Sequence, residues 1–212
     1  MCAIIGSFEK ENILELVEKN QHRGRVAYSI SLYDIKSSMV TSEYRLGEFD
    51  PEFLKSMNTD GSYIVCHLQS PTGVGYSDEN KRHPSVVNRS YLWHNGILMP
   101  STIKMLQEKY DDSTFDTHLL HQWLLSRGKL NEIEGSFACV FIAEHSMKIF
   151  RSKHSKLYID DNMTISSESF LESKCINADR IYMMDLEKRS LAIESYFKTK
   201  RYNIIIKGEL DD

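Results

Sequence analysis

The chain begins Met1-Cys2-Ala3-Ile4-Ile5-Gly6. Most chain termini are polar and frayed, but this one enters an apolar run at its second residue. A short run of small and apolar residues that ends at a glycine is typical of a buried strand. We therefore predict that residues 2–8 form a strand that ties the amino terminus into a sheet.

Cys2 also has a chemical significance. If Met1 is removed, this residue carries both a thiol and a free α-amine, and the amine can act as the base for its own side chain. The amine titrates near ~7.7–8.0 and a thiol near ~8.5, so both groups are poised close to neutral pH. The alternative is a small buried cysteine that only fills space.

The overall composition bounds the class of protein. A chain of 212 residues with a formal net charge of −4 suits one domain, or at most a tight pair, and does not favour a nucleic-acid or anionic-membrane partner. No apolar run approaches the ~20 residues of a membrane span, and the first residues lack the basic start of a signal peptide. The cysteines have no metal-site spacing, which predicts reduced thiols in a cytoplasmic protein; they are Cys2, Cys66, Cys139 and Cys175.

The hydrophobic pattern predicts many short strands and a few helices. Helical spacing of apolar residues predicts helices over ranges 9–19, 101–110 and 115–127. Apolar runs predict strands over ranges 2–8, 26–33, 38–46, 62–68, 90–94, 137–143, 148–151, 156–159, 163–166, 180–185, 191–196 and 201–207. Helices placed between blocks of strands favour the α+β class, with helices packed on sheets.

The Asn95-Gly96 pair that follows the apolar run 90–94 has two interpretations. Asn-Gly is a strong signal for a tight hairpin turn, which would end the strand there. Chemically, an Asn side-chain amide and a Gly backbone N–H also make a pair of donors for an oxyanion. Glycine lets a substrate approach the backbone closely.

Several segments, taken in order, resemble one family. The start Met1-Cys2-Ala3-Ile4-Ile5-Gly6 and the segment His94-Asn95-Gly96-Ile97 are similar to the first strand and the oxyanion segment of class II glutamine amidotransferase domains. These are the N-terminal-nucleophile glutaminases of asparagine synthetase, glucosamine-6-phosphate synthase and amidophosphoribosyltransferase. Other similar segments are Gln21-His22-Arg23-Gly24, His67-Leu68-Gln69-Ser70-Pro71-Thr72, His83-Pro84, Phe115-Asp116-Thr117, Glu134-Gly135-Ser136-Phe137-Ala138, Arg151, Lys156-Leu157-Tyr158, Ser166-Ser167-Glu168 and Arg180-Ile181-Tyr182.

The resemblance covers about residues 2–190. It implies a four-layered α/β/β/α sandwich of two antiparallel sheets, the N-terminal-nucleophile hydrolase fold. We expect residues 1–212 to form a single glutaminase-like domain, in which residues 191–212 are a C-terminal hairpin and an acidic tail.

The resemblance also implies roles for individual residues. Cys2 would attack the side-chain amide of glutamine with its own amine as the base. The Asn95 amide and the Gly96 N–H would bind the oxyanion. Asp116 would bind the α-amino group of the substrate. Without the other motifs, Asp116 would be interpreted as an ordinary acidic residue at a helix start.

Two positions depart from the family pattern. Ala3 replaces a glycine after the nucleophile, at the cost of one methyl group. Gln69 replaces the arginine that grips the substrate's α-carboxylate with a charged, planar fork, and offers only a neutral amide. By the resemblance, Gln69 and His67 belong to the substrate-binding set. Arg23 belongs to it too, as one candidate for the missing positive charge beside Arg25, Arg82 and Arg151.

The histidines of the matched segments could be interpreted as catalytic bases or metal ligands. By the resemblance, His22, His67, His83 and His94 lie at structural positions, so we predict no metal site and no cofactor. His118 and His121 are spaced to share a face of helix 115–127, and we predict that they lie on its surface.

The sequence shows no motif of an ammonia-acceptor domain. No Ser-Gly-Gly-x-Asp or GxxxxGK[ST] phosphate loop is present. We therefore expect a stand-alone domain that gives ammonia to a separate acceptor synthase subunit. Gln69 leaves two alternatives open: an amidohydrolase that acts on a different small amide, or a catalytically silent domain that binds or regulates a partner.

Overall fold

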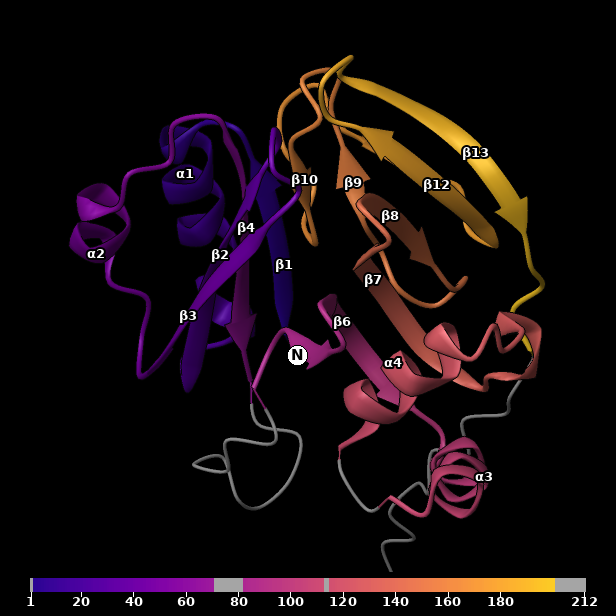
Figure 1. The fold of residues 1–212 in the computed structure, drawn as a ribbon. Coiled ribbons are helices and arrows are strands. Elements are labelled where there is room, and N and C mark those ends of the chain that lie inside the picture. The colour runs from indigo at the N-terminus through magenta and orange to yellow at the C-terminus, as the bar shows by residue number, and fades with distance from the viewer. Residues whose placement is uncertain (1, 71–81, 113–114, 201–212) are drawn as a thin grey trace, which may run out of the picture.

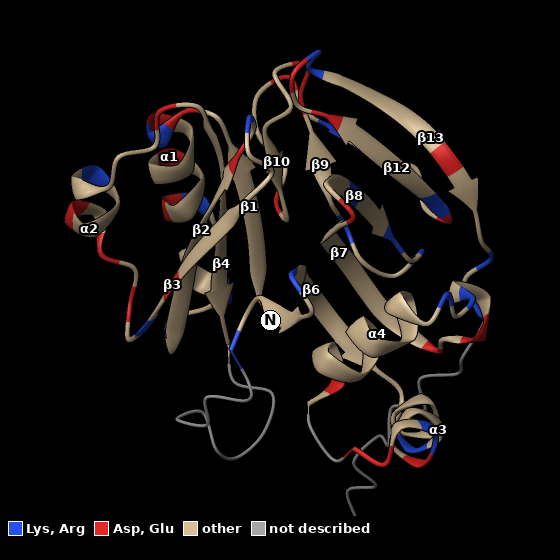
Figure 2. Ribbon diagram, viewed as in Figure 1, with Lys and Arg blue, Asp and Glu red and all other residues tan. Residues whose placement is uncertain are grey.

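The computed structural model describes residues 2–70, 82–112 and 115–200. Two β-sheets face each other in these parts of the chain, and helices cover the outer face of each sheet (Figure 1). This arrangement is the four-layered α/β/β/α sandwich that the resemblance implies. Lys, Arg, Asp and Glu gather on loops, turns and helices, whereas most of the strand surface carries other residues (Figure 2).

The first sheet contains the amino terminus near its middle. Its strand order is β11-β9-β10-β1-β4-β2-β3, and its pairs are antiparallel. The strands are β1 (Ala3–Ser7), β2 (Ala27–Asp34), β3 (Val40–Leu46), β4 (Ser62–Gln69), β9 (Tyr158–Ile159), β10 (Ile165–Ser166) and β11 (Lys174–Cys175).

The second sheet is formed by later parts of the chain and is also antiparallel. Its order is β13-β12-β8-β7-β6-β5. The strands are β5 (Ser85–Val87), β6 (Ser90–Leu98), β7 (Gly135–Ala143), β8 (Ser146–Arg151), β12 (Arg180–Asp185) and β13 (Ser190–Tyr196).

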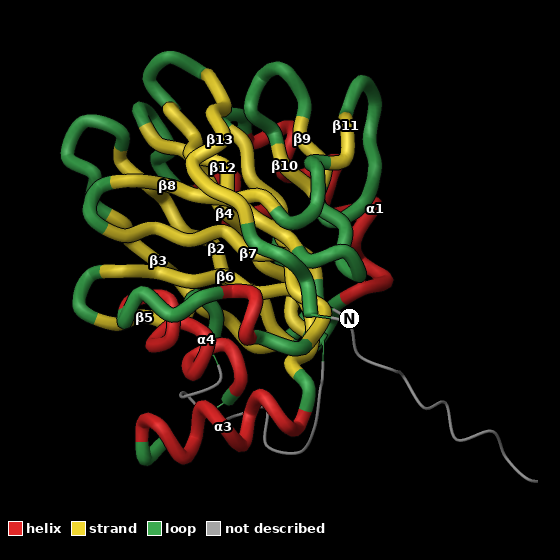
Figure 3. The backbone as a smooth tube through the Cα atoms, turned by 90° about the vertical axis from the view of Figure 1, so that its right-hand side faces the viewer, coloured by secondary structure: helices red, strands yellow, loops and turns green. Residues whose placement is uncertain are grey.

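Helices pack on the sheets in two pairs. Leu54 of α2 and three residues of α1 (Ile13, Leu16 and Val17) are buried against the first sheet, whereas α3 and α4 lie along the β5 and β6 side of the second sheet (Figure 3). The helical segments are α1 (Lys10–Asn20), η1 (Gln21–Arg23), α2 (Pro51–Ser56), α3 (Pro100–Tyr110), α4 (Asp116–Leu125) and η3 (Leu130–Glu132).

Strand β1 is buried on both faces, which explains its uninterrupted apolar sequence. Ala3 and Ile5 face the helical layer of α1, and Ile4 faces the core between the two sheets. On one side β1 pairs with β10, and on the other it pairs with β4, with Ile4 opposite His67. This register brings the start of β1 next to the end of β4, and so determines the surroundings of Cys2.

The prediction that the strand 90–94 stops at Asn95-Gly96 is wrong. Strand β6 continues to Leu98, and β7 pairs with it along its length, so that Gly96 lies opposite Phe137. A Cβ atom at Gly96 would lie 1.8 Å from the backbone oxygen of Ser136. Close sheet pairing therefore overrides the local turn preference of Asn-Gly, and the glycine is needed for backbone approach.

His121 is also placed differently from the prediction. Its side chain is fully buried, and its ring binds the hydroxyls of Ser85 and Ser90, at 3.1 Å and 2.8 Å. Ser85 belongs to β5, a short strand that the hydrophobic pattern did not reveal, and α4 packs on it. His118 is half-buried and shares the Ser85 hydroxyl at 3.0 Å.

The remaining secondary structure largely follows the predictions. Helix α2 and strand β11 were not predicted, because each is too short to show a period. Helix α2 begins where Asp50 accepts a hydrogen bond from Glu52 N at 3.0 Å. The predicted strand 201–207 lies outside the described residues. Within the described residues, the helices are too short or too polar to cross a bilayer.

Candidate active site

Cys2 lies at the start of β1 and is 8 % exposed. Its thiol donates to the carbonyl oxygen of Ser70, just past the end of β4, with a sulfur–oxygen distance of 3.8 Å. Burial raises the pKa of the Cys2 thiol above its ordinary value. The thiol therefore stays protonated at neutral pH and needs a base before it can react as a nucleophile.

Arg23 holds the backbone of Cys2. The guanidinium Nε donates to the Cys2 carbonyl oxygen at 3.0 Å, and Nη1 forms an ion pair with Glu168. The neighbouring Gly24 lets this loop pass close to β4, because a Cβ there would lie 2.7 Å from the Leu68 oxygen. Arg23, one of the predicted site residues, thus lies beside Cys2 and supports its main chain.

Asn95 and Gly96 lie on β6, in the sheet that faces β1. Asn95 is buried, and its Nδ2 donates to the hydroxyl of Ser167 at 3.0 Å. The same hydroxyl accepts a hydrogen bond from the backbone N–H of Ile4 at 2.9 Å. Ser167 therefore connects the strand of Cys2 directly to the predicted oxyanion donor. The sequence shows this serine in a matched segment but predicts no role for it.

Asp116 is the first residue of α4, at the far end of β6. Its Oδ1 accepts from the N–H of Thr117 at 2.8 Å, and its Oδ2 accepts from the N–H of Leu98 at 3.4 Å. His94 Nδ1 lies 4.0 Å from Asp116 Oδ2. These contacts attach the start of the helix to the strand that carries Asn95 and Gly96.

A layer of three buried histidines fills the space between β4, β6 and α4. His67 Nε2 binds the carbonyl oxygen of His94 at 3.3 Å, and its ring stacks on that of His83 with centroids 4.0 Å apart. The Thr117 hydroxyl binds both His83 Nε2 and His94 Nδ1, each at 3.1 Å. Because this hydroxyl has one hydrogen, at least one of the two rings must donate to it.

Burial keeps these histidines neutral. It lowers the pKa of His67 to about 3, and it lowers the pKa of His83 and of His94. Mutual repulsion between the rings acts in the same direction for His67 and His83, whereas nearby Asp116 partly offsets the shift at His94. Among the described residues, no group of three or more His, Cys, Asp or Glu side chains could hold a metal ion.

The histidine layer should make the fold sensitive to acid. The unfolded chain protonates a histidine near pH ~6.5, but folded His67 resists this until about pH 3, so the free energy of unfolding should fall as pH drops through that window. His67 should contribute up to about 1.4 kcal/mol per pH unit to the fall in the free energy of unfolding.

Urea unfolding at a series of pH values between 7 and 4 measures this pH dependence of stability. His67→Gln should flatten the slope, and the exposed control His145→Asn should not. Equal slopes in wild type and His67→Gln would contradict the argument.

Gln69 is the last residue of β4 and is 8 % exposed. Its backbone oxygen accepts from Val26 N at 3.2 Å. Besides Arg23, three arginines are candidates for the positive charge that is missing at position 69, and each makes contacts of its own. Arg25 lies 3.9 Å from Glu48, Arg82 lies over the ring of Tyr44, and Arg151 donates to the backbone oxygen atoms of Ile176, Ser152 and Ser155.

Two solved structures have a similar architecture. A glutamine phosphoribosylpyrophosphate (PRPP) amidotransferase from B. subtilis, complexed with ADP and GMP, matches with a TM-score of 0.68 and 16 % identity over 92 % of this chain. The chain has the N-terminal-nucleophile hydrolase fold of a class II glutamine amidotransferase domain. An allosteric regulatory enzyme of purine biosynthesis matches with a TM-score of 0.65 and 17 % identity over 92 % of the chain.

The amidotransferase likeness covers part of those proteins. This chain spans 49 % of the first matched chain and 48 % of the second, about half of each. No protein-family model and no curated protein sequence matches the chain. At this low identity the likeness establishes the fold alone.

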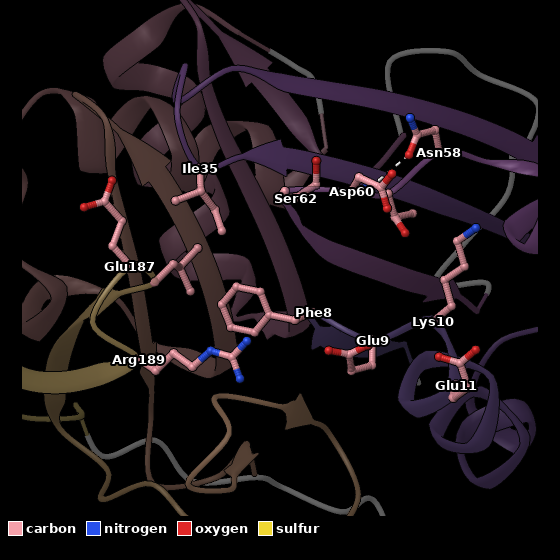
Figure 4. A pocket seen from close by; sticks show the side chains of 13 residues that line it. Phe8, Glu9, Lys10, Glu11, Ile35, Asn58, Asp60, Ser62, Glu187 and Arg189 are labelled. Atoms are coloured by element: carbon pink, nitrogen blue, oxygen red, sulfur yellow. Dashed lines mark hydrogen bonds between the residues drawn. The ribbon is translucent and has the colours of Figure 1, made fainter.

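A separate pocket of about 580 Å³ lies at the opposite end of β1 (Figure 4). The guanidinium carbon of Arg189 lies over the ring of Phe8, 4.5 Å from the ring centroid. Charged side chains, most of them exposed, surround this pair. None of the predicted site residues lines this pocket. Because Cys2 directly precedes β1 and Phe8 directly follows it, the length of the strand separates the pocket from the candidate active site.

Proposed function

We propose that this protein is a glutamine amidotransferase of class II that hydrolyses the side-chain amide of glutamine through Cys2. The observation that carries the proposal is the Ser167 hydroxyl, which binds both Ile4 on the Cys2 strand and Asn95 on the facing sheet. A thiol and an oxyanion donor that are far apart in the sequence are thereby held in one buried region. The amidotransferase-domain fold supports this assignment.

The proposed reaction proceeds through a thioester. Removal of Met1 frees the α-amine of Cys2, which takes the thiol proton as Sγ bonds to the amide carbon. The amide N–H of Asn95 and the backbone N–H of Gly96 stabilise the resulting oxyanion. Collapse of this intermediate breaks the carbon–nitrogen bond, and the amine returns a proton to the leaving ammonia. Water then hydrolyses the thioester to glutamate and restores the thiol.

Substrate binding would involve Asp116 and the β4 end. The Asp116 carboxylate would bind the α-ammonium group of glutamine by a charge-assisted hydrogen bond. Gln69 and His67 lie on β4 beside the Cys2 strand. The neutral Gln69 cannot form the bidentate ion pair that an arginine makes with the α-carboxylate of glutamine. It therefore favours a second candidate function, the hydrolysis of a small amide that lacks this carboxylate.

The partner and the location belong to the same proposal. We propose that the ammonia passes to a separate synthase subunit, as the resemblance implies, and that the protein is cytoplasmic. Four free cysteines support a reducing compartment: Cys2, Cys66, Cys139 and Cys175.

Intact mass spectrometry tests the proposal. The purified chain is exposed to a diazoketone analogue of glutamine, which alkylates a nucleophile in a glutamine site. We expect the mass without Met1 plus one adduct on Cys2. Removal of Met1 without an adduct would reject glutamine as the substrate, and ammonia release from simple amides would then test the second candidate. Retained Met1 would reject the amine as the base.

A further inference from the structure

Ser167 lies directly after β10, between the Cys2 strand and β6. Its backbone N–H donates to the Ile4 oxygen at 3.0 Å, and its hydroxyl accepts from the Ile4 N–H at 2.9 Å. The hydroxyl also accepts from Asn95 Nδ2 at 3.0 Å and donates to the Ile4 oxygen at 3.4 Å. The side chain is 2 % exposed, so water does not compete for these bonds.

These bonds use the full capacity of the Ser167 hydroxyl. A serine hydroxyl has one hydrogen and two acceptor positions. The hydrogen goes to the Ile4 oxygen, and the two acceptor positions take the N–H groups of Ile4 and Asn95. The hydroxyl can therefore only accept from Asn95, and this requires the amide to present its NH₂ end, not its oxygen, toward the Cys2 strand.

One N–H of Asn95 remains for a ligand. An Asn amide has two N–H donors, and Ser167 takes one of them. Within the described parts of the chain, the second has no hydrogen-bond partner, although Asn95 is 5 % exposed. A buried donor that is held in one orientation and left unused is suited to charge that develops during a reaction.

We infer that Ser167 is a positioning residue, which fixes the Asn95 amide so that its second N–H meets the oxyanion formed on a substrate at Cys2. This inference rests on the proposed function and adds a residue to it. Without the hydroxyl, the Asn95 amide can rotate, so its donor is no longer pre-organised. A small misplacement of a catalytic group can lower the rate by up to about 100-fold.

The chain offers a matched control in Ser152. Its backbone N–H donates to the Phe137 oxygen at 2.8 Å, and its hydroxyl accepts from the Phe137 N–H at 3.0 Å. Ser152 thus repeats the contact of Ser167 with Ile4 on another strand, is also buried, and makes no bond to Asn95. Ser152→Ala should cost similar stability without misplacing that amide.

A double-mutant cycle tests whether Ser167 acts through Asn95. We expect Ser167→Ala to lower kcat by roughly 10- to 100-fold with a smaller change in KM. In an Asn95→Ala background the same change should alter kcat by no more than roughly twofold, because the group that it positions is gone. Ser152→Ala should keep kcat close to wild type, and Ser167→Thr should restore most of it. Equal losses from Ser167→Ala in both backgrounds would overturn the inference.

A measurement without turnover separates this inference from the proposed function. Hydrogen exchange of the Asn95 side-chain NH₂ by ¹⁵N NMR, assigned with Asn95→Ala, should show one protected and one faster proton in the wild type. In Ser167→Ala both protons should exchange fast. If glutamine is not hydrolysed but this difference is present, the proposed reaction fails and the positioning stands. Unchanged exchange in Ser167→Ala would reject the positioning.

Discussion

Cys2→Ala should abolish the release of glutamate from glutamine. The thiol forms the bond to the amide carbon. The alanine variant keeps the amine, the oxyanion donors and Asp116, but it has no nucleophile. The change removes one sulfur atom from a site that is 8 % exposed, so the fold should persist. Glutamate and ammonia release by the purified variant measure the effect, and thermal unfolding checks that the protein is folded.

The other cysteines provide controls for this prediction. Cys175 is exposed, and Cys175→Ala should leave turnover unchanged. Cys66 and Cys139 are fully buried, and burial raises the pKa of both thiols, so neither should react with an analogue of glutamine. If Cys2→Ala hydrolyses glutamine at the wild-type rate, Cys2 is not the nucleophile and the proposed mechanism is wrong.

Asn95→Ala should lower kcat by ~10²–10³, the loss typical of one oxyanion donor. The donor acts on charge that exists only in the transition state, so KM should change little. Gly96 keeps its backbone N–H, which explains why some turnover should remain. Steady-state kinetics with glutamine measure both constants.

Asn20 is the matched control for Asn95. It is also a buried asparagine, and its Nδ2 donates to the Leu16 oxygen at 2.8 Å and to the Ser166 hydroxyl at 3.1 Å, in the layer of α1. Asn20→Ala should lower stability but preserve kcat. If the two variants lose turnover equally, the effect of Asn95 would come from folding and not from the oxyanion.

Local sequence patterns predicted most elements of this fold. The buried strand at residues 2–8 is confirmed as β1, and the helices predicted over 9–19, 101–110 and 115–127 are confirmed as α1, α3 and α4. Each helix has a period of apolar residues that one of its faces buries, whereas β1 has an uninterrupted apolar run that is buried on both faces. The α+β class and the two-sheet sandwich follow from these elements together with the resemblance.

The errors arose where distant segments overrule local preference. Asn-Gly favours a turn by itself, but pairing with β7 keeps Asn95 and Gly96 in a strand. His121 has a polar side chain on a short helix, but the serines of β5 and β6 satisfy both of its ring nitrogens inside the protein. Neither partner can be identified from the neighbouring residues.

The sequence by itself determined most of the elements and the types of residue at the candidate site, because periodicity and side-chain chemistry are local properties. Only the tertiary structure decided which of these groups meet. Ile4, Asn95 and Ser167 come together because β1 pairs with β4 and β10 while β6 faces it from the other sheet. Such contacts depend on strand register and on packing between sheets, which couple residues far apart in the chain and leave no periodic signal in either segment.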